Sequence, residues 1–310
     1  MNGKTNLKST PIMIRSLLFA AVFIGMHWLV VKVLPESKRL PERAPIDWTQ
    51  NFLLSPDKPA RIVAGSSYAD RLTPHNSDPD TLMININGGS AFDALAMLDK
   101  IKDTEYTPSL MAIEINRLTV IEPKDWLVEM LAEPSYSAWN SVPMLREKNR
   151  PMSIAGWPIH VLMNKLYLTG MERLGPPGSA ANIDVLEPDP KLLEMNIEDQ
   201  KKYLEDPVDD EKLAAIVYKL EKAVSKLQKN GCQVVFFHMP IHAELNFLDG
   251  PRSVFKAIRQ AFPEDRYDWV PEVDPGDYIF TDAVHMDSPS ASRYMKFLEN
   301  AISDLSGSEG

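Results

Sequence analysis

The sequence predicts an α/β fold with a mainly parallel sheet, arranged as a three-layer sandwich in which helices cover both faces. Three observations support this prediction. Short apolar segments alternate with amphipathic helical segments along most of the chain. The first three apolar segments end in Gly, Ser or Asn residues, and 310 residues with 44% apolar side chains are ample for a core.

The expected strands are the apolar segments 60–64, 81–86, 109–115 and 233–237, with a weaker fifth segment between 267 and 280. The expected helices cover 91–102, 210–229 and 290–305. The second of these is followed by Asn230 and Gly231, a typical helix end.

The range 123–207 does not follow this alternation. It contains many prolines, several aromatic residues and one expected helix at 159–172. We interpret it as a helical or irregular insertion over the carboxyl edge of the sheet, where open α/β folds bind their ligands.

The segment 12–34 is apolar apart from Arg15, His27 and Lys32, and its length favours a membrane-spanning helix. A cleavable signal peptide is the alternative, but no clear small-x-small cleavage site follows. A buried helix of a soluble domain is a third possibility, which the proline-rich, charged linker 35–58 argues against. The lysines and arginines on the two sides do not decide the orientation.

Charge and cysteine content exclude several classes of function. The net charge is −10, and residues 1–43 hold seven Lys or Arg against two Glu, so the rest of the chain carries about −15. Nucleic-acid binding is therefore not expected, because it depends on clustered basic residues. Cys232 is the only cysteine, which excludes an intramolecular disulfide and a cysteine-rich metal site. We expect no cofactor and no metal.

The ends of the first three strands and one late loop carry residues that acyl transfer requires. Ser67 is the candidate nucleophile, His285 the base that accepts its proton, and Asp282 the carboxylate that orients the base. A tetrahedral intermediate also needs donors for its oxygen. The Ser67 amide, an amide of Gly88 or Gly89, and the Asn116 side chain are the candidate oxyanion-hole donors.

Each of these residues also has a purely structural interpretation. Ser67 suits a helix N-cap, Asp282 a cap or Asx turn, His285 an exposed loop and Asn116 a turn. Their combined order at strand and loop ends favours the catalytic interpretation.

Two histidines, His238 and His242, have a spacing that invites a metal site. Pro240 between them makes the required helix implausible. We expect His238 to contact substrate, while both residues equally suit a simple turn. Arg117 follows the third strand, and an ion pair with Glu114 is the commoner fate of such an arginine.

The order of these blocks resembles the SGNH (GDSL-like) hydrolase family, whose blocks contribute Ser, Gly, Asn and His. The blocks here are IVAGSSYADRL, INGGSAFD, IEINRL and Asp282-Ala283-Val284-His285. Ser66 stands where many members have Asp, and the usual Gly-x-Asn-Asp form is absent. The resemblance covers about residues 60–305 and implies an SGNH/flavodoxin-like sheet.

The resemblance implies a serine esterase or O-acetyltransferase, similar to membrane-anchored members that act on bacterial exopolysaccharides. It implies a cytoplasmic tail at 1–11, an inner-membrane anchor at 12–34, a catalytic domain at 59–305 facing the periplasm or cell exterior, and a polar tail at 306–310. A membrane acyltransferase or polysaccharide synthase complex would then be the partner. The alternatives are a membrane-held lipid or small-ester hydrolase and a non-catalytic component of a polysaccharide complex.

Overall fold

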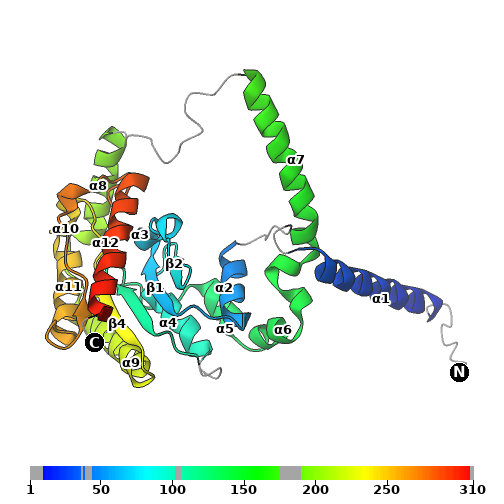
Figure 1. Cartoon of the computed structure of the whole chain (residues 1–310), viewed down its shortest axis with the longest axis horizontal. Coiled ribbons are helices and arrows are strands. Elements are labelled where there is room, and N and C mark those ends of the chain that lie inside the picture. Colours follow the sequence, from blue (N-terminus) through cyan, green and yellow to red (C-terminus); the bar gives the residue numbers. More distant parts are fainter. Residues whose placement is uncertain (1–9, 36–37, 39–43, 102–105, 175–189, 308–310) are drawn as a thin grey trace, which may run out of the picture. The chain divides into compact units, whose positions relative to one another are not determined.

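The computed structural model describes residues 10–35, 38, 44–101, 106–174 and 190–307. It divides into two compact units: residues 1–54 with 132–177, and residues 55–131 with 178–310. The second unit contains the whole sheet (Figure 1), and every residue of the predicted site belongs to it.

The second unit is an α/β fold with a five-stranded parallel sheet, as the sequence predicted. In the sheet order β2-β1-β3-β4-β5, its strands are β2 (Thr81–Ile86), β1 (Arg61–Ser66), β3 (Leu110–Glu114), β4 (Gln233–Phe237) and β5 (Asp268–Trp269). β2 and β4 have the predicted bounds. β1 continues to Ser66, two residues past its predicted end, and β5 has only two residues.

The strand register brings the candidate loops to one edge of the sheet. Ser66 lies opposite Ile86 of β2, and Glu114 lies opposite Phe237 of β4. In this order β1 has β2 on one side and β3 on the other, so the order of strands reverses between β1 and β3. Open parallel sheets bind ligands beyond the carboxyl ends of the strands at such a point.

Most helices and 3₁₀ turns of the second unit connect the parallel strands, and the last two follow β5. These elements are α3 (Ser67–Asp70), η2 (Thr73–His75), α4 (Ala91–Lys100), α5 (Asp125–Leu131), α8 (Pro190–Leu204), α9 (Asp210–Lys229), α10 (Ala243–Asn246), α11 (Asp249–Ala261), η7 (Pro275–Asp277) and α12 (Ser288–Gly307).

Two of these helices begin at strong N-terminal caps. α9 has the predicted bounds and starts where the Asp209 side chain accepts the Lys212 amide at 2.8 Å. α4 starts with a reciprocal capping box between Ser90 and Asp93. Local side-chain chemistry therefore fixes both helix starts.

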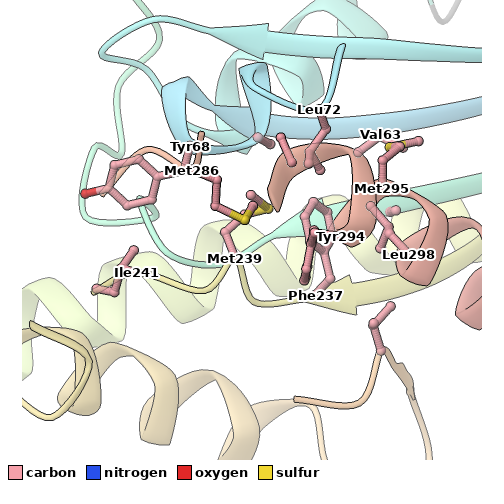
Figure 2. Packing of buried hydrophobic residues seen from close by; sticks show 14 of the residues in the cluster. Val63, Tyr68, Leu72, Phe237, Met239, Ile241, Met286, Tyr294, Met295 and Leu298 are labelled. Carbon is pink, nitrogen blue, oxygen red and sulfur yellow. The ribbon is translucent and has the colours of Figure 1, made fainter. Parts of the chain in front are cut away.

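The core beside the candidate site is built from the sheet, α12 and the loops at the carboxyl edge. Figure 2 shows Tyr294 and Leu298 of α12 in one buried cluster with Val63 of β1 and Phe237 of β4. Burial of each such side chain contributes about 2 kcal/mol. The Tyr294 hydroxyl donates to the His238 carbonyl at 2.9 Å, so this packing also fixes the loop after β4.

The first unit is helical in its described residues. α1 (Thr10–Val33) includes the exposed apolar segment Ile12–Val33, which is long enough to span a membrane or to act as a signal sequence. The range expected as a linker, 35–58, contains helix α2 (Ala44–Leu54). Ile46, Phe52 and Leu53 are buried at helical spacing, a pattern that the nearby prolines obscured in the sequence.

The range expected as one insertion, 123–207, is shared between the two units. α6 (Ser135–Ser141) and α7 (Pro151–Leu174) belong to the first unit, and α8 belongs to the second. α7 begins eight residues before the predicted helix 159–172. Pro151 is its first residue, a position where proline favours a helix start.

Candidate active site

Two adjacent serines lie at the end of β1, and they have different environments. Ser66 is the N-cap of α3, and its side chain accepts the Tyr68 amide at 3.1 Å. The same hydroxyl donates to Glu114 and is 1% exposed. Ser67 is the first residue of α3 and is partly exposed, and no described residue hydrogen-bonds its hydroxyl. Ser67 is therefore the available nucleophile of the pair.

The Asp282-His285 pair lies in the loop before α12. His285 Nδ1 is 2.7 Å from Asp282 Oδ2 and 2.9 Å from Oδ1, and the His285 amide also donates to Oδ1 at 2.9 Å. Burial alone would raise the pKa of Asp282, but the hydrogen bonds and charge of His285 outweigh it and leave this pKa below its ordinary value. An ionised carboxylate only accepts, so in the neutral form of the His285 ring Nδ1 carries the proton and Nε2 is the acceptor. This is the tautomer that a general base requires.

The backbone of this loop is closed on itself around the pair. Both the amide and the hydroxyl of Thr281 donate to the His285 carbonyl, at 2.8 and 3.1 Å. Ala283 has φ 74°, a left-handed conformation that costs a non-glycine residue about 1 kcal/mol or more. Its carbonyl accepts the His242 amide at 2.8 Å, so the strained residue is held from outside the loop.

Tyr68 connects the two halves of the candidate site. Its ring lies edge-on to the His285 ring, with centroids 5.6 Å apart, and it directly follows Ser67 in the chain. Burial raises the pKa of Tyr68, so the phenol stays neutral. The structure thus brings His285 against α3, the helix that begins with Ser67. The catalytic roles themselves stay predictions.

Two of the four expected oxyanion donors, Gly89 and Asn116, make hydrogen bonds within the protein. The Gly89 amide donates to the Ile86 carbonyl at 2.9 Å within the turn after β2. Asn116 Nδ2 donates to the Met239 carbonyl at 2.8 Å and lies 3.2 Å from His238 Nε2, while its Oδ1 accepts the Met239 amide at 2.7 Å. Asn116 therefore fixes the loop after β4 to the end of β3.

The amides of Ser67 and Gly88 lie directly after the paired ends of β1 and β2. Gly88 has φ 68°, a conformation that favours glycine and turns the chain directly after β2. Since Ser66 lies opposite Ile86, these two amides belong to neighbouring strand ends on the same edge. Their role as oxyanion donors stays a prediction.

His238 lies in the wall of a cavity of about 180 Å³ beyond the carboxyl ends of β3 and β4. Tyr68, Asn116, Arg117 and Phe255 also line this cavity. Burial lowers the pKa of His238 to about 4, so the ring is neutral and can accept from Asn116. Tyr68 contacts both this cavity and His285, whereas Ser67 and His285 do not line it.

Sequence reasoning missed two features of the site. Glu114 was considered only as a partner of Arg117, yet it binds Ser66, while the Arg117 guanidinium lies 5.7 Å from the centre of the Tyr68 ring. A single acidic residue in an otherwise apolar strand was the available signal. The contact of Tyr68 with His285 had no signal in the sequence.

Among the described residues, no group of three or more His, Cys, Asp or Glu side chains is placed to hold a metal ion. No protein-family model, curated protein or solved structure matches the chain.

Proposed function

We propose that this protein is a serine-dependent O-acyl transferase or esterase that passes an acetyl group through a Ser67 acyl-enzyme. The observation that carries this proposal is the Asp282-His285 pair, with Nδ1 bound to the carboxylate, on a strained loop beside the α3 turn. A solvent-exposed structural histidine has no need of such a loop.

The chemistry follows from the assigned groups. His285 Nε2 accepts the Ser67 proton while Ser67 Oγ attacks the carbonyl carbon of the acyl donor. The developing oxyanion is stabilised by the amides of Ser67 and Gly88. The protonated His285 then gives its proton to the leaving oxygen, and an ester remains on Ser67. An acceptor hydroxyl attacks this ester in transfer, and water attacks it in hydrolysis.

The acceptor we propose is a hydroxyl of an envelope or secreted polysaccharide. This part rests on the SGNH resemblance, which also implies a three-layer arrangement of helices around the sheet. α1 would hold the protein in the inner membrane with the sheet-bearing unit in the periplasm or at the cell exterior. A membrane acyltransferase or polysaccharide synthase complex would supply the acyl donor or the glycan.

The cavity next to the site favours a short acyl group over a lipid chain. It has a volume of about 180 Å³, and its walls include the polar residues Asn116, Arg117 and His238. A long acyl chain needs a larger and more apolar site. Because Ser67 and His285 do not line this cavity, it bears on the acyl group only through Tyr68, which contacts both the cavity and His285.

The full-length chain in detergent provides the test. We expect it to hydrolyse p-nitrophenyl acetate faster than longer esters. Ser67→Ala should lower kcat by a factor of about 10⁴ or more. The exposed Ser225 of α9 gives the matched control, since Ser225→Ala removes a hydroxyl far from the site. Equal activity of Ser67→Ala and wild type would overturn the proposal.

Two further measurements divide the alternatives. Preference for acyl chains of eight or more carbons would instead support the lipid hydrolase, and a wild type without any esterase activity would support the non-catalytic alternative. Mass spectrometry of acetylated Ser67, followed by its loss when a glycan is added, would distinguish transfer from hydrolysis.

A further inference from the structure

The buried carboxyl group of Glu114 lies beneath the turn that carries Ser67. Glu114 is the last residue of β3, and all other residues of this strand are apolar and buried. Its own exposed fraction is 1%. A carboxylate in such a place is costly unless hydrogen-bond donors surround it.

Those donors come from the residue just before Ser67. The Ser66 amide donates to Glu114 Oε2 at 2.6 Å, and the Ser66 hydroxyl lies 2.8 Å from Oε1 and 3.0 Å from Oε2. Because the same hydroxyl accepts the Tyr68 amide, one carboxyl group fixes Ser66 and, through it, the start of α3. Ser67 lies between the two anchored residues.

The close approach of Glu114 requires the glycine before this turn. A Cβ on Gly65 would lie 2.6 Å from Glu114 Oε2 and 2.8 Å from Asn85 Oδ1. The three strands β1, β2 and β3 therefore meet at this point with no spare room. The position of the carboxyl group is set by the sheet itself.

Charged and titratable groups from several elements face Glu114. Arg117, after β3, and the amides of Ser66 and Ala69 favour its ionised form. Tyr68 of α3 and Tyr294 of α12 lie within electrostatic reach. Burial is the strongest influence and raises the pKa of Glu114 to about 7.

We propose that Glu114 is a positioning residue that holds the Ser67 hydroxyl in its reactive place by binding both the amide and the side chain of Ser66. This inference rests on the proposed function of Ser67. The ionised carboxylate accepts from every donor around it. Protonation of Glu114, or its replacement by glutamine, turns one of the two accepting groups of the carboxylate into a donor. One of the hydrogen bonds from Ser66 is then lost.

Three variants of the full-length chain in detergent test this role. Glu114→Gln keeps the shape of the side chain and should lower kcat for p-nitrophenyl acetate by about tenfold to a hundredfold, with KM little changed. The labelling rate of Ser67 by a fluorophosphonate should fall by a similar factor. Ser66→Ala retains the carboxyl group but loses its hydroxyl contact, and should show a smaller loss of the same kind.

The third variant is a rescue. Ser66→Asp combined with Glu114→Gln places the carboxylate at position 66 and the donor at position 114, so the hydrogen-bonded pair is restored with its direction reversed. We expect this double variant to recover most of the lost kcat and labelling rate. Because kcat is taken per folded molecule, a residue that only stabilised the fold would show no loss of kcat for this variant to recover.

Val224→Ala, a core substitution in α9, serves as the control for general destabilisation. It should lower the melting temperature and leave kcat per folded molecule unchanged. The inference is overturned if Glu114→Gln retains wild-type kcat and labelling rate. It is also overturned if the activity of this variant falls only in proportion to the amount of folded protein. Should Glu114→Gln not fold, wild-type kcat in Ser66→Ala would overturn it. An active Ser67→Ala protein would instead overturn the proposed function.

Discussion

The two loops that form the candidate site are held in place by different means. The turn Gly65–Tyr68 depends on a carboxyl group from another strand, 48 residues later in the chain. The loop Thr281–His285 is closed mainly by its own hydrogen bonds and by one left-handed residue, with one further bond from the His242 amide to the Ala283 carbonyl. The first loop is therefore sensitive to charge and packing at a distance, and the second to its own backbone and carboxylate.

The largest expected effect belongs to the second loop. Asp282→Asn should lower kcat by about 10⁴, because an amide no longer fixes the proton on His285 Nδ1. The backbone bonds to position 282 can persist, so far-UV circular dichroism and the melting temperature should change little. A kcat within tenfold of wild type would show that the carboxylate is not the orienting group.

The pH dependence of stability should have opposite signs in the two loops. The pKa of Glu114 is about 7 in the folded chain against an ordinary value of 4.5. The native state therefore binds more protons than the unfolded state between these values, and the free energy of unfolding falls as pH rises through them, by about 3 kcal/mol. The pKa of Asp282 is lowered, so its contribution is present above its ordinary pKa and is lost as pH falls.

Urea unfolding across this pH range measures both contributions. The free energy of unfolding of Glu114→Gln should vary less with pH than that of wild type between pH 4.5 and 7. For Asp282→Asn it should vary less than that of wild type only at lower pH. Identical pH profiles for wild type and Glu114→Gln would contradict the assignment.

Gly65→Ala should destabilise the protein by about 2 kcal/mol, since the added methyl group would overlap the Glu114 carboxyl group and the Ala69 side chain. The matched control is Gly276→Ala in an exposed turn, where the nearest atom would be 3.2 Å away. Thermal unfolding of both variants measures the difference. Equal melting temperatures would show that the first loop tolerates displacement.

Ala283→Gly should have the smallest effect, a change of less than about 1 kcal/mol, because relief of the left-handed strain is offset by the greater freedom of glycine when unfolded. Ala283→Val should lower stability and kcat together, because a β-branched residue disfavours positive φ and Ala283 is fully buried. Urea unfolding and kcat of the two Ala283 variants measure these effects. A Val variant that matched the Gly variant would show that the loop is not held in this conformation.

The sequence predicted those parts of the fold whose signals are local. The bounds of β2, β4 and α9 follow from apolar segments bordered by turn residues and caps, and the structure confirms them. The helix α2 was missed because the prolines and charges around it suggested a linker. The end of β1 was placed too early because Gly65 and Ser66 resemble a turn, whereas pairing with Asn85 and Ile86 of β2 and the Glu114 contact keep them extended.

In the candidate site, too, the sequence predicted local contacts and missed contacts between residues that are distant in the chain. Asp282 and His285 are three residues apart, so their hydrogen bond could be expected from a short motif. Asn116 was predicted as an oxyanion donor, but the structure gives its amide to His238 and Met239, which lie far along the chain. The Glu114-Ser66 contact likewise depends on strand pairing that no local pattern specifies.

The single cysteine has a practical consequence. Cys232 is 3% exposed, and burial raises its pKa to about 12, so the thiolate that reacts with maleimides is scarcely formed at neutral pH. The natural chain is thus already suited to site-specific labelling. One cysteine introduced at an exposed position such as Ser225 would take up a fluorophore or spin label alone. Such labels could report the distance of the sheet-bearing unit from a lipid bilayer.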